Sequence, residues 1–421
     1  EQLLSKQPAS SPTSAAAELK PEVEVKEPEP KPDQPASTTK ATETNPKVNQ
    51  VIPIPAEDLA AIKDIFSVDT FFATETIPYQ DGAIFRGNLR SAPDHAHGRL
   101  SDLLAEKLGD RYRLFLVEGQ ENKPVVIVLP GNSDLQSTTW AQKVLAVVLA
   151  IATVFTSLET AGILLGFDFY GNWNRLHDVL PVSLGILMIL AVHELGHWLL
   201  ANRHQVQISP PFWIPAWQIG SFGAITRFES LLSSRTILFD ISFAGPAMGW
   251  VLSFGLLILG LLLSHQGSLF QVPAEFFRES ILVGILAKVT LRSALQATLV
   301  DVHPLMVLGW LGLVINAINL MPAGQLDGGR IMQAIYGRKI AGRSTIVTLI
   351  VLALASLVNP LALYWGVLIL ILQRNLERPS LDDISAPNDT RAALGLLAFF
   401  LMLMTLLPLT PSLADRLGIG G

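Results

Sequence analysis

The residues in this sequence whose types and spacing are best suited to chemistry are His193-Glu-Leu-Gly-His197. Residues i and i+4 share one face of a helix, so both imidazoles can bind the same ion. Glu194 directly follows the first histidine, where its carboxylate can reach a water on that ion without being a ligand. This is the spacing of helical zinc-protease motifs. The same five-residue pattern also occurs by chance in unrelated helices, so its surroundings must decide.

Those surroundings are apolar. Only apolar residues fill positions 185–192, and Trp198-Leu-Leu-Ala201 follows the motif. About twenty such residues are enough to cross a bilayer. Ionisable groups are costly inside a membrane and therefore mark functional sites there. We interpret the motif as a metal site within a membrane-spanning helix.

A catalytic zinc site needs a third protein ligand and an open position for water. The best candidate is Asp327, in Asn319-Leu-Met-Pro-Ala-Gly-Gln-Leu-Asp-Gly-Gly-Arg330. It follows the apolar run 305–321 and precedes two glycines, which let the backbone approach a ligand closely. Considered alone, this aspartate is better explained as a helix cap at the membrane surface.

Together the two motifs resemble those of the site-2 protease family of intramembrane zinc metalloproteases. That family has a His-Glu-x-x-His helix and a later Asn-x-x-Pro-x-x-x-Leu-Asp-Gly segment. The resemblance implies that His193, His197 and Asp327 bind one Zn²⁺ ion and that Glu194 is the catalytic acid and base. It also implies that Asn319 helps to hold the substrate or the reaction centre.

The chain resembles more closely the chloroplast and cyanobacterial branch of this family, the ethylene-dependent gravitropism-deficient and yellow-green-like proteases. Three further segments carry this similarity, at 87–90, 220–226 and 243–249, and the resemblance covers about residues 51–411. It implies a cyanobacterial thylakoid or plasma membrane, or a chloroplast membrane. Many family members insert a PDZ domain between spans, but the gap 264–303 is too short for one.

The composition indicates a membrane protein with a soluble front part. Half of the residues are hydrophobic and 16% are charged, against about 25% in soluble domains. The net charge of −6 and the lack of a basic patch with interleaved aromatic residues argue against a nucleic-acid partner. Without cysteine, disulfides and thiolate metal sites are excluded. Because the sequence begins with Glu1, we expect that an upstream segment is missing.

We predict three parts. Residues 1–50 contain eight prolines, eight acidic residues and no aromatic residue, which predicts a disordered tail. Residues 51–137 read as a small α+β soluble domain, and 138–421 as the intramembrane metalloprotease domain. In the small domain we expect helices at 56–66 and 102–108 and strands at 112–118 and 124–130. His95 and His97 fall in an expected polar loop, where solvated side chains are a simpler interpretation than a second metal site.

The protease domain is predicted to be α-helical and polytopic, with about seven spans. Stretches of suitable length lie at 144–166, 181–201, 237–263, 304–321 and 392–409. Asn359-Pro360 divides the stretch 344–372, which we interpret as a hairpin of two short spans. Residues 280–301 contain three charged residues and are expected to lie on the membrane surface.

Lysine and arginine positions predict the orientation. Seven spans place the loops 202–236, 323–343 and 373–391 on one side, and these loops contain ten Lys or Arg residues. This side, with the amino-terminal domain, is expected to face the cytoplasm or stroma. The zinc helix then runs toward it, and Asp327 reaches the same leaflet.

The segment 209–226 is apolar and aromatic but contains three prolines, which makes it a poor helix. We expect a membrane-dipping loop with an extended edge that could pair with an unwound substrate, with Gly223 and Ala224 binding substrate or supporting the site. An interfacial aromatic anchor explains the segment equally well. The small residues of 243–249 are expected to serve helix packing. Glu159 could serve a water path or pair with an interfacial Lys or Arg.

These features predict an intramembrane zinc metalloprotease that cleaves peptide bonds within or near transmembrane segments, for regulated proteolysis or turnover. Its partners would be transmembrane protein substrates and the lipid bilayer. A transporter would also place histidines and carboxylates in spans, but it usually shows inverted repeats, which we do not find here. A zinc-binding scaffold without catalysis is the other alternative, and the presence of Glu194 argues against it.

Overall fold

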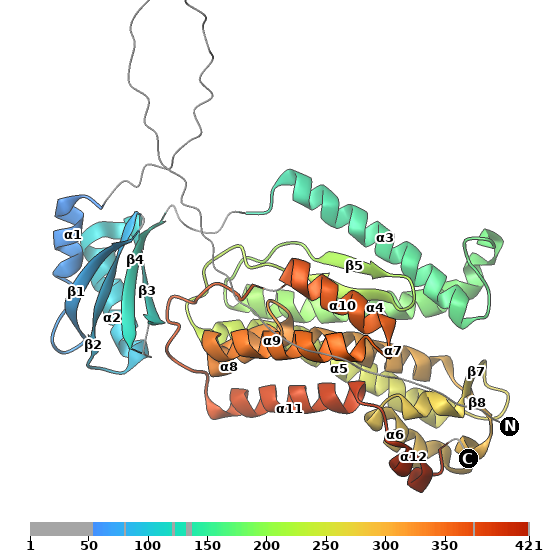
Figure 1. The fold of residues 1–421 in the computed structure, drawn as a ribbon. Coiled ribbons are helices and arrows are strands. Elements are labelled where there is room, and N and C mark those ends of the chain that lie inside the picture. Colours follow the sequence, from blue (N-terminus) through green and yellow to red (C-terminus); the bar gives the residue numbers. More distant parts are fainter. Residues whose placement is uncertain (1–53, 80, 120–122, 132–136, 374, 420–421) are drawn as a thin grey trace, which may run out of the picture. The chain divides into compact units, whose positions relative to one another are not determined.

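The computed structural model describes residues 54–79, 81–119, 123–131, 137–373 and 375–419. The tail predicted at 1–50 lies outside these residues. The described chain begins with an α+β part and continues as a mostly helical part (Figure 1).

The α+β part contains a four-stranded antiparallel sheet in the order β1-β2-β4-β3. Its strands are β1 (Phe71–Tyr79), β2 (Gly82–Leu89), β3 (Tyr112–Glu118) and β4 (Pro124–Pro130). β3 and β4 confirm the two predicted strands, whereas β1 and β2 were not predicted.

Helices α1 (Ala56–Lys63) and α2 (Pro93–Leu108) contribute to the same apolar core as the sheet. α2 starts nine residues before the predicted helix, so the polar loop expected around His95 and His97 is wrong. Pro93 at the first helical position suits a helix start. His97 Nε2 lies 3.3 Å from the carbonyl oxygen of Leu114.

In the described part of the chain, four helices are long and apolar enough to cross a membrane. They are α3 (Trp140–Leu164), α4 (Leu176–Arg203) with the turn before it, α5 (Arg235–Leu263) and α11 (Asp389–Leu406). Each corresponds to a predicted span. The shorter α7 (Pro304–Asn319) covers most of a fifth predicted span, so the expected total of seven is not confirmed.

The remaining described helices are no longer than α11. The stretch 338–372 divides into α9 (Arg338–Ala355) and α10 (Pro360–Leu368), and the Asn359 side chain accepts a 3.0 Å hydrogen bond from the N–H of Leu361. This confirms the helix break predicted at Asn359-Pro360.

Residues 264–303 form a small unit beside the long helices. Strands β7 (Phe270–Pro273) and β8 (Leu299–Val302) pair antiparallel, and α6 (Ile281–Leu291) contacts α11 and α12 (Pro411–Leu417). The 11 residues of α6 span about 16 Å. This helix is too short to cross a bilayer, as expected for a segment that is not a span, and its location on the membrane surface stays a prediction.

The helix α5 lies at the centre of the helical part and contacts α4, α7 and α8 (Asp327–Tyr336). Gly196 on α4 allows one of these close approaches, because a Cβ there would lie 2.4 Å from the carbonyl oxygen of Ala244 on α5. These helix contacts bring the ends of α4 and α7 together.

The segment 209–226 forms an antiparallel hairpin of β5 (Phe212–Ala216) and β6 (Gly220–Ile225), which confirms the predicted extended backbone. Helix α3 holds the hairpin: Thr156 Oγ1 donates to the carbonyl of Gly220 over 2.5 Å, and Thr160 Oγ1 donates to that of Trp217 over 3.3 Å. Of the three prolines, Pro215 lies within β5, and Pro210 and Pro211 directly precede it.

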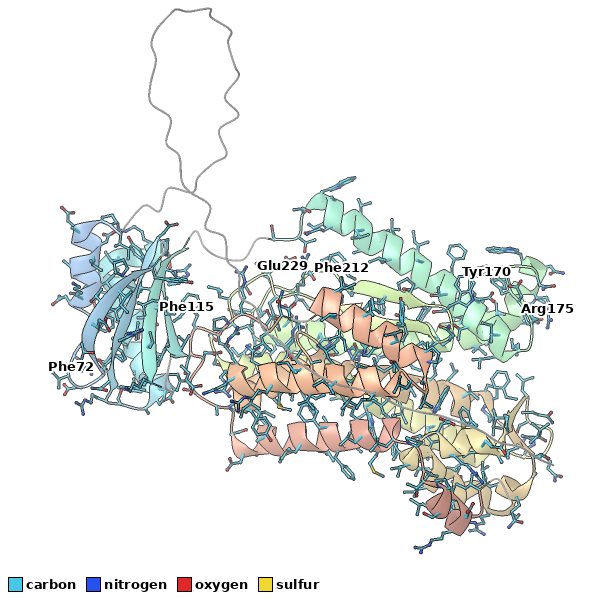
Figure 2. All side chains as sticks on the ribbon, in the orientation of Figure 1. Phe72, Phe115, Tyr170, Arg175, Phe212 and Glu229 are labelled. Carbon is cyan, nitrogen blue, oxygen red and sulfur yellow. The ribbon has the colours of Figure 1, made fainter. Side chains whose placement is uncertain are left out.

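Glu159, near the end of α3, has a role that was not predicted. Its carboxylate is buried and accepts hydrogen bonds from the backbone N–H groups of Phe169 (3.1 Å) and Tyr170 (3.3 Å). It therefore holds the turn between α3 and α4, where Figure 2 labels Tyr170 and Arg175.

Candidate metal centre

Three buried side chains from two helices form a triangle of potential metal ligands. His193 and His197 lie on α4, and Asp327 is the first residue of α8. The two Nε2 atoms are 3.2 Å apart, and Asp327 Oδ2 lies 3.2 Å from His193 Nε2 and 3.4 Å from His197 Nε2. Zinc bonds of about 2.0–2.1 Å at tetrahedral angles need ligand atoms about 3.3 Å apart. The three atoms therefore fit three corners of a zinc site.

The other ring nitrogen of each histidine faces an oxygen acceptor. His193 Nδ1 lies 2.8 Å from Asn316 Oδ1, and His197 Nδ1 lies 2.8 Å from the carbonyl oxygen of Ile241. Because these oxygens only accept, each Nδ1 donates its proton to the oxygen, and each neutral ring has its lone pair on Nε2. Both lone pairs then face Asp327, as metal binding requires.

Glycines make room for these ligands. A Cβ at Gly245 on α5 would lie 2.2 Å from His197 Nε2, and a Cβ at Gly328 would lie 1.9 Å from the carbonyl oxygen of Leu320. The segment 243–249, expected to serve helix packing, therefore also borders the candidate metal site. Gly328 permits the tight turn that brings Asp327 back to the end of α7.

Glu194 lies beside the triangle and is half-buried. Its Oε2 atom accepts a 2.8 Å hydrogen bond from Thr226 Oγ1. Both residues line a groove of about 540 Å³. The groove is also lined by Lys143 of α3, by Ala191, Leu195 and Trp198 of α4, and by 208–211 and Glu229. Figure 2 labels Glu229, and Phe212 in the adjoining strand β5.

Thr226 also lines a second, much smaller cavity of about 10 Å³. His197 and Asp327 line this cavity, together with Ala224, Ile225, Asn319, Gln325, Leu326 and Arg330. Thr226 therefore lies between the groove beside Glu194 and the space beside the metal ligands.

Asn319 connects α7 to the hairpin. Its Nδ2 atom donates to the carbonyls of Phe222 (3.0 Å) and Ile315 (2.9 Å). Gly223 has a φ of +107°, and a Cβ there would lie 2.5 Å from Asn319 Nδ2. The end of α7 and the strand β6 therefore meet closely beside the metal ligands.

An ion pair that was not predicted from the sequence lies next to this site. Arg330, one turn after Asp327, donates from Nε to Glu377 Oε2 (3.0 Å) and from Nη2 to the carbonyl of Thr226 (2.8 Å), and its guanidinium lies over the ring of Phe228. Arg330 and Glu377 are both buried. The sequence offered one signal for Arg330, its position in the Asp-Gly-Gly-Arg motif, and no local signal for Glu377.

Comparison with known proteins agrees with this geometry. Residues 181–358 match the model of Peptidase family M50, and residues 60–137 match that of the EGY3 middle domain. The chain is 38% identical over 366 residues to the probable zinc metalloprotease EGY2, chloroplastic, of Arabidopsis thaliana, an alignment that covers 84% of this chain and 65% of that protein.

Two further relatives give similar values. Identity is 37% to the EGY2 protein of Oryza sativa subsp. indica, over 86% of this chain and 68% of the relative. Identity is 36% to the probable zinc metalloprotease EGY1, chloroplastic, of Arabidopsis thaliana, over 86% of this chain and 73% of that relative. No solved structure matches the chain.

The chain belongs to peptidase family M50, the membrane-embedded site-2 type zinc metalloproteases, as the two sequence motifs predicted. Within that family it is similar to the EGY proteins along most of its length. The zinc metalloprotease relatives and the triangle of ligand atoms both support Zn²⁺ as the cofactor.

Proposed function

We propose that this chain is an intramembrane zinc metalloprotease that hydrolyses peptide bonds within or near transmembrane segments of membrane proteins. One observation carries the proposal: three ligand atoms spaced for zinc lie directly beside Glu194, which lines an open groove. A transporter has no need of a carboxylate in this position, and a non-catalytic scaffold has no need to keep it.

In this proposal His193, His197 and Asp327 hold the ion. When bound there, zinc supplies Lewis acidity, which activates water and polarises a peptide carbonyl. Glu194 takes the proton of the attacking water and later delivers it to the leaving amine. The Thr226 hydroxyl donates to Oε2 of Glu194, so the other carboxylate oxygen is left to accept that proton.

Asn319, Gly223 and Ala224 support the site and present strand β6 to the substrate. The Thr226 carbonyl, directly after β6, accepts a hydrogen bond from Arg330 of α8, from which we infer that it faces away from β5. Because alternate residues of a strand direct their backbone groups to opposite edges, the N–H and C=O of Ala224 face the same side as that carbonyl. An unwound substrate segment could add to this edge as a further strand.

The membrane arrangement extends the proposal. α7 and the α9–α10 pair would complete the four long helices to about seven spans. The 16 residues of α7 reach about 24 Å, a mismatch that local thinning of the bilayer can absorb. The arginine-rich loops and the amino-terminal part would face the cytoplasm or stroma. The relatives named as chloroplastic support a chloroplast membrane, and a cyanobacterial membrane is the alternative.

A single preparation tests the activity. The full chain is purified in detergent, its zinc content is measured, and a panel of membrane-spanning peptides is offered in proteoliposomes. We expect about one zinc per chain, and cleavage that a chelator abolishes and added zinc restores. Intact peptides with zinc moving across the vesicle membrane would indicate a transporter. A zinc-loaded chain that neither cleaves nor transports would indicate a scaffold.

A further inference from the structure

Asn316 is a polar residue in the last turn of the apolar helix α7, and its side chain is fully buried. Its Nδ2 atom donates to the carbonyl of Gly312 over 2.7 Å, and its Oδ1 atom lies 2.8 Å from His193 Nδ1. A carbonyl only accepts, so the Gly312 contact fixes which end of the amide is the NH₂ group. The amide oxygen must therefore face the histidine.

We propose that Asn316 is a positioning residue that sets the tautomer and the ring orientation of His193, and through them the affinity of the site for zinc. The inference rests on the proposed role of His193 as a ligand. A neutral imidazole carries one proton, which the amide oxygen holds on Nδ1, so the lone pair stays on Nε2. Without this acceptor, the proton can occupy Nε2 and the ring can turn away from Asp327.

The two histidines are held in different ways. His197 Nδ1 donates to the backbone carbonyl of Ile241, an acceptor that side-chain substitution cannot remove. His193 has a side-chain acceptor instead, supplied by a helix more than a hundred residues further along the chain. Asn316 therefore joins α7 to the zinc helix at the ligand itself, and its effect on the metal can be measured by substitution.

Gly249 on α5 gives a second way to disturb the same contact. A Cβ there would lie 2.3 Å from Asn316 Oδ1 and 2.9 Å from Asn316 Nδ2. Since Asn316 is fully buried, its amide can move away from the added methyl group only if its hydrogen bonds break. Gly249→Ala therefore displaces Asn316 Oδ1 from His193 Nδ1 although the asparagine itself is unchanged.

The test uses two substitutions with the same number of side-chain heavy atoms as asparagine. Asn316→Leu removes the acceptor, whereas Asn316→Asp keeps an oxygen facing Nδ1. Partners of this kind typically change metal affinity by about 10–100-fold. In the full chain in detergent, we expect the zinc Kd to rise by about that factor in Asn316→Leu and to stay within about threefold of wild type in Asn316→Asp. The visible spectrum of the Co²⁺-loaded protein should change only in the leucine variant.

A double-variant cycle separates positioning from packing. Gly249→Ala should weaken zinc binding when Asn316 is present, and should add no further loss in the Asn316→Ala background, where the clash is gone. Resistance of the zinc-free protein to trypsin checks that each variant is folded.

Wild-type zinc affinity and an unchanged Co²⁺ spectrum in folded Asn316→Leu would show that Asn316 only packs, and would overturn the inference. An equal loss from Gly249→Ala in both backgrounds would also overturn it. If His193→Ala binds zinc with wild-type affinity, His193 is not a ligand, and the inference about Asn316 is overturned with it. These measurements need no substrate, so an inactive wild type would contradict the protease function while the affinity ratios still decide the role of Asn316.

Discussion

At the scale of single residues, the position of Glu194 separates catalysis from metal binding. Glu194→Gln keeps the size of the side chain and an oxygen that can accept from Thr226, but it has no carboxylate to take up a proton. We expect unchanged zinc content and a fall in cleavage rate of at least about 10²-fold, since general acid–base catalysis contributes about 10²–10⁴-fold. Metal analysis and a peptide assay on one sample measure both. Cleavage near the wild-type rate would remove Glu194 from the acid–base role.

Asp327 gives the complementary result. Asp327→Ala removes one corner of the ligand triangle, so zinc affinity and cleavage should both fall. Asp327→Asn is the matched control, because it keeps the shape of the side chain but provides a weaker, neutral ligand. Its zinc affinity and cleavage rate should lie between those of Asp327→Ala and wild type. Chelator competition measures the affinity. If zinc affinity is unchanged in Asp327→Ala, then this residue only caps α8 and a different ligand completes the site.

The residues around this site differ in how far sequence could predict them. The spacing of His193 and His197 follows from helix geometry alone. The partnership of Asp327 with them came from a family motif. Asn316 and Gly245 could not be predicted, because their roles depend on α5 and α7 packing against α4. The available signal for Asn316 was its polar side chain in the apolar run 305–321, which it shares with Asn319.

At the scale of secondary-structure elements, the hairpin β5–β6 leads to a prediction about substrate capture. In the proposed arrangement Ala224, which pairs with Trp213, directs its N–H away from β5, so Ala224→Pro should remove an outward donor while the hairpin remains. We expect cleavage of membrane-embedded peptides to fall at least about tenfold, roughly what the loss of one or two backbone hydrogen bonds produces. Zinc content should stay unchanged, and short peptides that are already extended should be cleaved more nearly as in wild type.

Two controls make this prediction specific. By the same alternation, the N–H of Ile225, which pairs with Phe212, would face β5. Ile225→Pro should then disturb the hairpin itself, whereas Ile225→Val keeps the N–H and should resemble wild type. Equal and small effects of Ala224→Pro and Ile225→Val would show that the hairpin is an anchor and that the substrate binds elsewhere. Loss of zinc in Ala224→Pro would mean that the strand supports the metal site.

Elements with a regular pattern were predictable and irregular ones were not. β3 and β4 are apolar runs and were predicted correctly. In β1 a register shift between Ala73 and Glu75 breaks the alternation, and Pro78 falls within the strand. β2 contains two glycines, which lower strand propensity. The number of spans could not be predicted from the sequence either. A helix as short as α7 can cross a bilayer or end within it, and its tertiary contacts decide which.

At the scale of the whole molecule, the loop between α10 and α11 links the amino-terminal sheet to the metal centre. The N–H of Leu116 on β3 donates to the carbonyl of Leu381 over 2.7 Å, and the N–H of Asp383 donates back to the carbonyl of Leu116 over 2.9 Å. The same loop carries Glu377, which binds Arg330 beside Asp327. A change at this junction can therefore reach the site through a short series of bonded groups.

Asp383 makes this junction sensitive to pH. Burial raises the pKa of its carboxyl from 3.8 to about 6, and the nearby Asp382 adds to the rise. The N–H of Ser380, Arg338 and Arg235 act in the opposite direction. The folded state therefore binds more protons than the unfolded state between about pH 4 and 6. Stability falls as the pH rises through this window, and the loss is complete above about pH 6.

Asp383→Asn should remove this penalty, because an amide of the same shape stays neutral and its oxygen can still accept from Ser380. A shift of roughly two pKa units corresponds to about 2–3 kcal/mol as an upper value. We expect the variant to unfold a few degrees higher than wild type at pH 8 and at the same temperature at pH 4, measured by thermal unfolding in detergent. If the variant is less stable at pH 8, the attraction of the carboxylate to Arg235 and Arg338 outweighs its burial, and the junction is held together by charge.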